Sequence, residues 1–236
     1  QGFRSPTLKE MYMVFNMANM MMIYGNPDLK SETSHNFSLS AEYTKNRYNF
    51  SVTGYYNLVH NRINTVYSED PKGQIYTNTD KVDIAGVDAN ISAKYPCGLG
   101  FRMSYTYIHE FMRDGQKKFT DTRPHTATVR VDWGENLDKV DFNYSLNGRI
   151  LSEVKTNVYN DSFNNPAAGS TAVTYPGYMI WDLTFSVGVF KGVNMNLAIN
   201  NLFNYVPDYY YFNSPTTTGA NLTLGLSLDI DRFFKK

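Results

Sequence analysis

Apolar side chains recur at every second position along most of this chain. The last such segment, residues 221–230, reads NLTLGLSLDI and places its large apolar side chains on one face of an extended strand. Eight further segments show the same two-residue period: 33–44, 48–63, 74–95, 99–112, 126–133, 140–151, 178–189 and 193–203. The pattern predicts an all-β protein with nine full strands, preceded by the tail of a tenth strand before Met11.

The connections between these strands alternate between short and long. Short turns follow four of the strands, after Thr44, Tyr95, Trp133 and Val189. The other connections are polar loops, most of them longer than the ~4–6 residues usual in compact domains: 68–73, 113–123, 152–176 and 204–220. A transmembrane β-barrel has short periplasmic turns at one end and long extracellular loops at the other. The alternation therefore predicts an antiparallel transmembrane β-barrel wall.

The composition is compatible with strands that cross a membrane. Hydrophobic residues make up 42% of the chain, and the mean hydropathy is -0.43. No uninterrupted apolar run approaches the ~18 residues of a membrane helix. Tyrosine is frequent, with 19 Tyr and 15 Phe against 2 Trp. It suits a membrane–water interface, because its ring meets acyl chains while its hydroxyl stays hydrated.

Charge and motif content exclude several classes of function. Basic and acidic side chains are equal in number, 22 of each, so the chain lacks the positive field of a nucleic-acid-binding protein. The single cysteine, Cys97, cannot form an internal disulfide. No Ser-His-Asp set, Cys-x-x-Cys pair or pair of carboxylates stands out. We therefore predict that the chain is not an enzyme and has no nucleic-acid partner.

Five short motifs occur in order along almost the whole chain. The first two are FRSPTLKEMY (3–12) and GNPDLKSETS (25–34). The others are YTN (76–78) leading into IAGVD (84–88), then RPHTAT (123–128) and NNLFNY (200–205). Together they resemble the sequence boxes of TonB-dependent outer-membrane receptors. The chain departs from the usual boxes at Ser5 and Ser31, and in having Lys235 and Lys236 after the aromatic Phe234.

The resemblance implies both a location and a larger protein. Receptors of this family form a 22-stranded barrel with a plugged lumen in the bacterial outer membrane. On this basis residues 1–236 are expected to be the C-terminal portion of the barrel domain, without the N-terminal plug and the first half of the barrel. The expected partners are outer-membrane lipid and, through the missing N-terminal region, the TonB complex.

Each box also has a structural interpretation. The sequence Asn26-Pro27-Asp28 forms turns readily, because proline fixes φ and the Asn and Asp side chains accept hydrogen bonds from nearby amides. Gly86 lies within a predicted strand, where glycine marks a bulge or close packing. We expect the boxes to serve mainly to shape the loop exits.

The cargo is inferred from the first two boxes, whose pairing most resembles the haem/haemoglobin receptor subgroup. A histidine is expected between these boxes, and this chain has none there. Thioether and phenolate groups are also haem ligands, although methionine equally well fills apolar gaps. Haem, or a haemoprotein, is thus the expected cargo, with no resident cofactor and no firm metal site. The candidate binding residues are Met17, Met20, Met21, Met22, Tyr24, Asn26, Asp28 and His35, with Tyr24 and His35 as possible iron ligands.

Other functions fit the same pattern. Within the receptor family, cobalamin or a ferric siderophore is an alternative cargo. A stand-alone small β-barrel, acting as an adhesin or structural protein, would share the alternation. A soluble β-sandwich binding module would bury Leu222, Leu224, Leu226, Leu228 and Ile230 against a second sheet.

Overall fold

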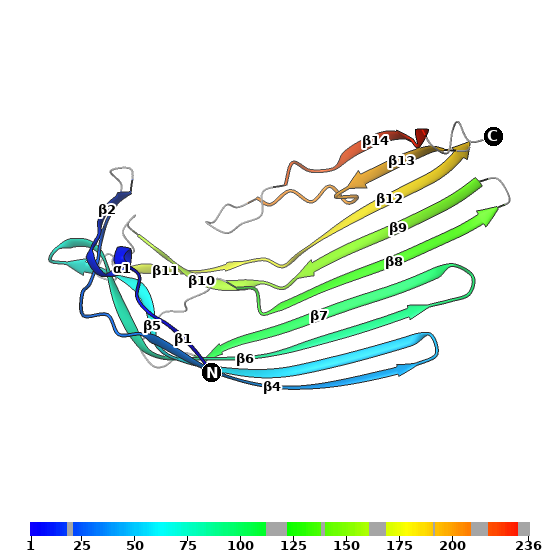
Figure 1. Ribbon diagram of the computed structural model, residues 1–236. Coiled ribbons are helices and arrows are strands. Elements are labelled where there is room, and N and C mark those ends of the chain that lie inside the picture. The colour runs from blue at the N-terminus through cyan, green and yellow to red at the C-terminus, as the bar shows by residue number, and fades with distance from the viewer. Residues whose placement is uncertain are drawn as a thin grey trace.

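The computed structural model describes residues 1–17, 21–111, 122–137, 140–160, 169–190, 192–208 and 217–230. Its main feature is a single large curved antiparallel sheet (Figure 1). Nine strands follow one another across it: β4 (Glu32–Lys45), β5 (Tyr48–Glu69), β6 (Lys72–Lys94), β7 (Leu99–Phe111), β8 (His125–Leu137), β9 (Val140–Leu151), β12 (Tyr178–Phe190), β13 (Val193–Asn200) and β14 (Asn221–Leu228). The nine strands expected from the alternating pattern are therefore confirmed.

The sheet is open within the described residues. β14 forms one edge, and β4 lies near the other, where only the short strand β1 (Gly2–Arg4) pairs with it. β1 is antiparallel to β4 and pairs with its first residues, from Glu32 to Ser34. It therefore occupies the place expected for the end of a tenth strand. We call the two ends of the sheet the short-turn end and the long-loop end.

The register aligns the apolar positions of neighbouring strands. One row runs through Leu224, Leu197, Phe185, Tyr144 and Trp133, each directly opposite the next. Because directly paired residues project to the same side of a sheet, these five side chains share one face. That face is uncovered: Leu224 is 69% exposed and Trp133 is 41% exposed.

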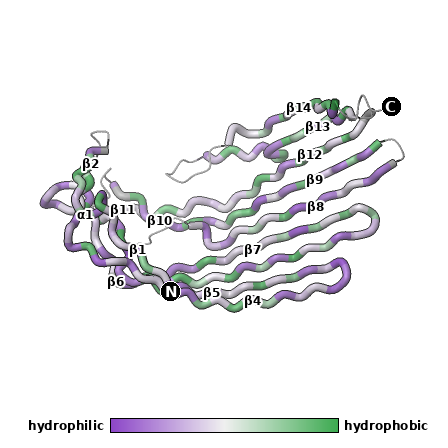
Figure 2. Tube along the Cα trace, viewed as in Figure 1, coloured by the Kyte–Doolittle hydropathy of each residue, from purple (hydrophilic) through white to green (hydrophobic). Residues whose placement is uncertain are grey.

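The adjacent row carries the opposite chemistry. It runs through Thr223, Ala198, Thr184, Ser145 and Asp132, again as direct partners. Figure 2 shows the resulting alternation as green and purple bands along the strands. The sheet thus has one apolar face and one polar face, as a barrel wall between lipid and an aqueous lumen requires. We call them the outer face and the inner face.

The β-sandwich alternative is wrong. It requires the apolar side chains of the last strand to be buried, yet Leu222, Leu224, Leu226, Leu228 and Ile230 are between 53% and 73% exposed. In water this contiguous apolar surface would cost roughly 25 cal/mol per Å² left uncovered. A lipid environment removes that cost.

Two expected loops contain strands. Residues 68–73 form the tip of a hairpin, because β5 and β6 pair in a single register from Glu69 and Lys72 down to the sheet, interrupted only at Asn61. The expected loop 152–176 contains the hairpin of β10 (Val154–Tyr159) and β11 (Ser170–Tyr175), which forms a separate two-stranded sheet. In the second segment, β-branched residues such as Val154, Val158 and Val173 favour strands among the surrounding polar residues.

Two strands also end at residues other than those predicted from the sequence. β8 continues to Leu137, so the expected turn at residues 134–136 is part of the strand. β13 ends at Asn200 instead of Phe203, because Asn201 has a positive φ of 53° that breaks the extended backbone. The helix α1 (Leu8–Tyr12) is short, and no described helix has the length and apolarity needed to cross a membrane.

The two faces predict opposite responses to an added charge. Leu224→Arg places a cation on the outer face, at mid-strand, and should destabilise the whole protein in a lipid bilayer by ~2–4 kcal/mol. Thr223→Arg, on the inner face of the same strand, is the matched control and should be nearly neutral. Equilibrium unfolding in phospholipid vesicles measures both. Equal destabilisation by the two variants would contradict the assignment of faces.

Candidate functional site

A four-stranded arm extends from the long-loop end of the sheet. It consists of the outer parts of β5 and β6 (62–69 and 72–79) together with β2 (Val14–Met17) and β3 (Met21–Tyr24). β3 joins β6 in parallel, pairing Ile23 with Gln74 and Tyr24 with Ile75, and β2 is antiparallel to β3. In Figure 1 the arm bends away from the line of the long strands. Residues 14–17 and 21–24 are therefore the two strands of a hairpin.

The base of the arm contains much of the buried core. Val59, Ile63 and Val82 are all buried there, with Val82 only 1% exposed. Asn61, between Val59 and Ile63, has a φ of 53°. Asparagine tolerates this left-handed conformation better than other non-glycine residues. The arm thus starts at a defined backbone turn over an apolar base.

Two asparagines fasten the second box to the arm. The Asn26 side chain donates to the Tyr76 carbonyl at 3.0 Å and accepts from the Asp28 amide at 2.9 Å. Asn78 accepts from the Lys30 amide at 2.8 Å and donates to the Lys30 carbonyl at 2.9 Å and the Asn61 carbonyl at 2.7 Å. These amide groups therefore satisfy backbone groups in a segment that forms no regular ladder.

An ionic clasp joins the first box to the second. The Arg4 guanidinium lies 2.9 Å from the Glu10 carboxylate and 3.6 Å from the Glu32 carboxylate. Glu32 also accepts from the Ile63 amide at 3.2 Å, at the base of the arm. Glu10 closes a capping box with Thr7 at the start of α1. The clasp therefore links β1, α1, β4 and β5.

The clasp also shifts the pKa values of Glu10 and Arg4. Partial burial raises the pKa of Glu10, but hydrogen bonds from the Thr7 amide and hydroxyl and from Arg4 outweigh it, so the pKa lies below its ordinary 4.5. The hydrogen bond to Glu10 is the main cause that raises the pKa of Arg4. Both groups are stabilised in their charged forms.

One face of the arm is continuous with the inner face of the sheet. Arg62, at the start of the arm, lies 3.7 Å from Glu110, an inner-face carboxylate whose side chain is only 5% exposed. Val66 lies on the same side of β5 as Arg62 and pairs with Ile75, which in turn pairs with Tyr24. The surface formed by Val14, Met22, Tyr24, Val66 and Ile75 is called the arm face.

The arm face is mainly apolar and partly open. Val14 and Val66 are exposed, and Met22, Tyr24 and Ile75 are half-buried. Gly73 has a φ of 152°, and a Cβ there would lie 2.5 Å from the Met22 carbonyl and 3.0 Å from the Tyr24 ring. A glycine is therefore needed for β3 to lie this close to the hairpin.

The structure separates the residues that the sequence grouped into one binding site. Met22 and Tyr24 meet on the arm face, whereas Asn26 is committed to the turn and Asp28 is exposed. His35 pairs with Leu58 on the outer face of the sheet, the opposite side from Arg62 and the arm face. The backbones of Met17 and Met21 pair across the β2–β3 hairpin. Met20 lies outside the described residues.

The fourth and fifth boxes fasten loops at the same end. Arg123, only 6% exposed, donates to the carbonyls of Ser152 and Pro176 and lies over the Tyr178 ring at 4.8 Å. Asn201 accepts from the Tyr205 amide and donates to its carbonyl. These contacts agree with the expectation that the boxes mainly shape the loop exits.

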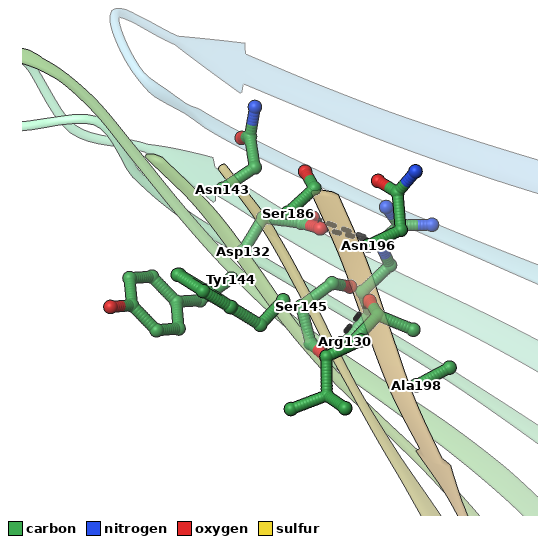
Figure 3. A pocket seen from close by; sticks show the side chains of 11 residues that line it. Arg130, Asp132, Asn143, Tyr144, Ser145, Ser186, Asn196 and Ala198 are labelled. Carbon is green, nitrogen blue, oxygen red and sulfur yellow. Dashed lines mark hydrogen bonds and ion pairs between the residues drawn. The ribbon is translucent and has the colours of Figure 1, made fainter. Parts of the chain in front are cut away.

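A shallow cavity of about 360 Å³ lies on the wall, towards the short-turn end and away from the arm (Figure 3). Its polar side holds Arg130 and Asp132 in contact at 2.7 Å, and Arg102 reaches the same carboxylate at 3.2 Å. The described residues contain no group of three or more His, Cys, Asp or Glu side chains placed to hold a metal ion. Ion pairing and hydrogen bonding are the chemistry that this surface offers.

Comparison with known proteins places the chain among receptor barrels. Residues 1–202 match the family described as TonB dependent receptor-like, beta-barrel. A relative in Vibrio cholerae serotype O1, the "Iron-regulated outer membrane virulence protein", is 24% identical over 247 residues, which cover 96% of this chain and 36% of the relative. The chain thus spans about a third of the length of that relative.

Solved structures share the fold at low sequence identity. The pyoverdine outer membrane receptor FpvA from Pseudomonas aeruginosa PAO1, bound to pyoverdine, superposes with a TM-score of 0.68 at 19% identity, covering 87% of this chain and 31% of FpvA. The copper transporter OprC superposes with a TM-score of 0.70 at 14% identity, covering 96% of this chain and 35% of OprC. These relatives are receptors and transporters, in line with the prediction that the chain is not an enzyme.

Removing the Asn78 side chain should loosen the arm. Asn78→Ala deletes three hydrogen bonds to Lys30 and Asn61, each of which contributes ~0.5–1.5 kcal/mol. Hydrogen exchange of the Lys30 amide in the whole protein should accelerate about tenfold or more, since ~1.4 kcal/mol corresponds to a factor of ten. Asn196→Ala, an exposed inner-face change, is the control. Unchanged protection at Lys30 would show that Asn78 does not hold this segment.

The clasp should weaken in acid. Because the folded pKa of Glu10 is depressed, its stabilisation is complete above the ordinary pKa of 4.5 and is lost as pH falls through the lower folded value. The protection factor of the Thr7 amide, which donates to Glu10 at 2.8 Å, should therefore decrease over that range. Glu10→Gln should abolish this pH dependence. A protection factor with the same pH profile in both proteins would contradict the clasp.

Proposed function

The chain belongs to the TonB-dependent receptor-like β-barrel family, and from this premise we propose that it is the C-terminal part of an outer-membrane receptor that takes up an iron compound. Its location is the bacterial outer membrane. The uptake itself belongs to the whole receptor, which would add a plug, the remaining strands of a 22-stranded barrel and the region that binds the TonB complex. This chain would contribute part of the wall and part of the cargo entrance.

The observation that carries the cargo site is the arm face. It lies at the long-loop end, which is the extracellular end of such a barrel, and it continues into the inner wall past Arg62 and Glu110. It presents the Tyr24 phenol and the Met22 thioether among aliphatic side chains. Mainly apolar lining with a few placed polar groups is the usual composition of a small-molecule site.

Haem is the cargo that we propose first. A porphyrin has two flat apolar faces, which would pack on Val66, Ile75 and Met22, and an iron that accepts phenolate or thioether ligands. Packing contributes roughly 25 cal/mol per Å² of apolar surface buried, so it would dominate the affinity. His35 is left out of this surface because it lies on the outer face.

A ferric siderophore is the second candidate. It is favoured by the pyoverdine receptor among the structural neighbours and by the iron regulation named for the Vibrio cholerae relative. Siderophores present polar and charged groups, so a siderophore would depend on Arg62 more than on the aliphatic residues of the arm face. The two cargoes therefore predict different sensitive residues.

Haemin titration of the full-length receptor tests the proposal. Tyr24→Ala should raise the Kd for haemin by about ten- to thirtyfold, the ~1.4–2 kcal/mol of an interface anchor. Tyr24→Phe should keep most of the affinity and change the Soret spectrum only if the phenol binds iron. Tyr67→Phe, on the other face of the arm, is the matched control and should match wild type.

The outcomes separate the cargo from the site. If Tyr24→Ala and Met22→Ser both keep the haemin affinity of the wild type, the arm face is excluded as the haem-binding site. If the wild type does not bind haemin but binds ferric pyoverdine, and Arg62→Gln weakens that binding, the siderophore replaces haem as the proposed cargo. The membrane assignment does not depend on either result.

A further inference from the structure

All four histidines of the chain lie on the outer face near its long-loop end. His35 pairs with Leu58, and His60, two residues further along β5, is on the same face. His109 pairs with Ala85, and His125 pairs with Tyr107. Towards the short-turn end, the outer face continues as the exposed apolar side chains that include the row from Leu224 to Trp133. We call these side chains the apolar belt.

These histidines form a nearly continuous series of ring contacts with aromatic residues. The ring centroids of His35 and His60 lie 6.5 Å apart. Across β5 to β8, the centroid distances are 6.1 Å for Tyr56–Phe111, 4.7 Å for Phe111–His109, 6.4 Å for His109–Tyr107 and 4.8 Å for Tyr107–His125. The Tyr105 hydroxyl lies 2.7 Å from His125 Nδ1. We call the four histidines and these aromatic partners the histidine rim.

The opposite rim of the apolar belt has a different composition. Near the short turns the belt ends in aromatic residues such as Tyr48, Tyr95 and Trp133, with the permanent cations Lys45 and Arg47 beside them. All four histidines lie at the other rim, near the long loops. The two rims meet different leaflets of the membrane.

Few acidic groups oppose the imidazoles within the described residues. On the neighbouring strands they face Tyr56, Tyr105, Tyr107, Lys81 and Asp83. Asp83 is already held by Lys81 at 3.2 Å and by the Tyr56 hydroxyl at 2.9 Å. Protonated imidazoles would therefore add positive charge that no further described carboxylate on this surface offsets.

We propose that the histidine rim binds the phosphate groups of anionic lipids in the outer leaflet, more tightly as pH falls. The rim is continuous with the lipid-covered belt, so lipid is the occupant that the geometry favours, and aromatic girdles of barrels lie at the headgroup level. Imidazole ordinarily gains its proton between pH 5 and 8. The aromatic rings then contact the acyl boundary while the imidazoles reach the phosphates.

Native mass spectrometry of the full-length receptor tests this proposal. The probes are lipid A with two phosphates and zwitterionic phosphatidylcholine, each at about pH 7.5 and about pH 5.5, on either side of the imidazole transition. The fraction of receptor that retains lipid A should rise at least about fivefold at the lower pH, the effect of one cation near an anionic surface. Retention of phosphatidylcholine should not change.

A variant with His35→Gln, His60→Gln, His109→Gln and His125→Gln should lose this rise while keeping basal lipid retention. If it does not assemble, the pair His109→Gln and His125→Gln should reduce the rise. Lys45→Gln with Arg47→Gln, at the opposite rim, is the control and should keep it. The proposal is overturned if the histidine variants keep the full pH dependence, or if phosphatidylcholine shows the same rise. Haemin affinity, measured on the same samples, reports separately on the cargo site.

Discussion

The structure depends on one constraint: a backbone that crosses lipid must satisfy its hydrogen bonds within the protein. Antiparallel pairing between neighbouring strands meets that constraint, from β4 through to β14. Once the strands pair in register, a two-residue period in each strand becomes two chemically distinct faces. The row from Leu224 to Trp133 and the adjacent row from Thr223 to Asp132 follow directly from it.

Beyond the membrane the same requirement is met by side chains. The segment between β3 and β4 forms no regular ladder, so Asn26 and Asn78 supply hydrogen bonds to its backbone, and Arg4 links the carboxylates of Glu10 in α1 and Glu32 in β4. Arg123 does the same for the loops beside β9 and β12. The motifs that identify the family thus hold loop segments in place through hydrogen bonds and ion pairs. The arm face that they position is formed by ordinary aliphatic and aromatic residues.

Each face then acquires its own role from what it meets. The inner wall and the arm face meet water and cargo, whereas the outer face meets acyl chains and, at its two rims, headgroups. Tyr24 and His35 are only eleven positions apart and were both candidate iron ligands, yet they lie on opposite faces. Register, and not proximity in sequence, decides which surface a side chain serves.

The sequence alone determined the nine strands, their faces and the structural nature of the boxes, because side-chain alternation and turn-forming residues are local properties. It also named Met22 and Tyr24 as candidate binding residues, which remains a prediction. It did not predict the arm, because the parallel pairing of Ile23 and Tyr24 with β6 joins residues about fifty positions apart. Nor did it show that Arg62 lies on the inner side. Side chains of β5 alternate between the two faces up to His60, but the positive φ of Asn61 interrupts this alternation, and Arg62 then lies beside the inner-face residue Glu110. Only the tertiary structure decided those points, because they depend on long-range pairing and on one residue's backbone conformation.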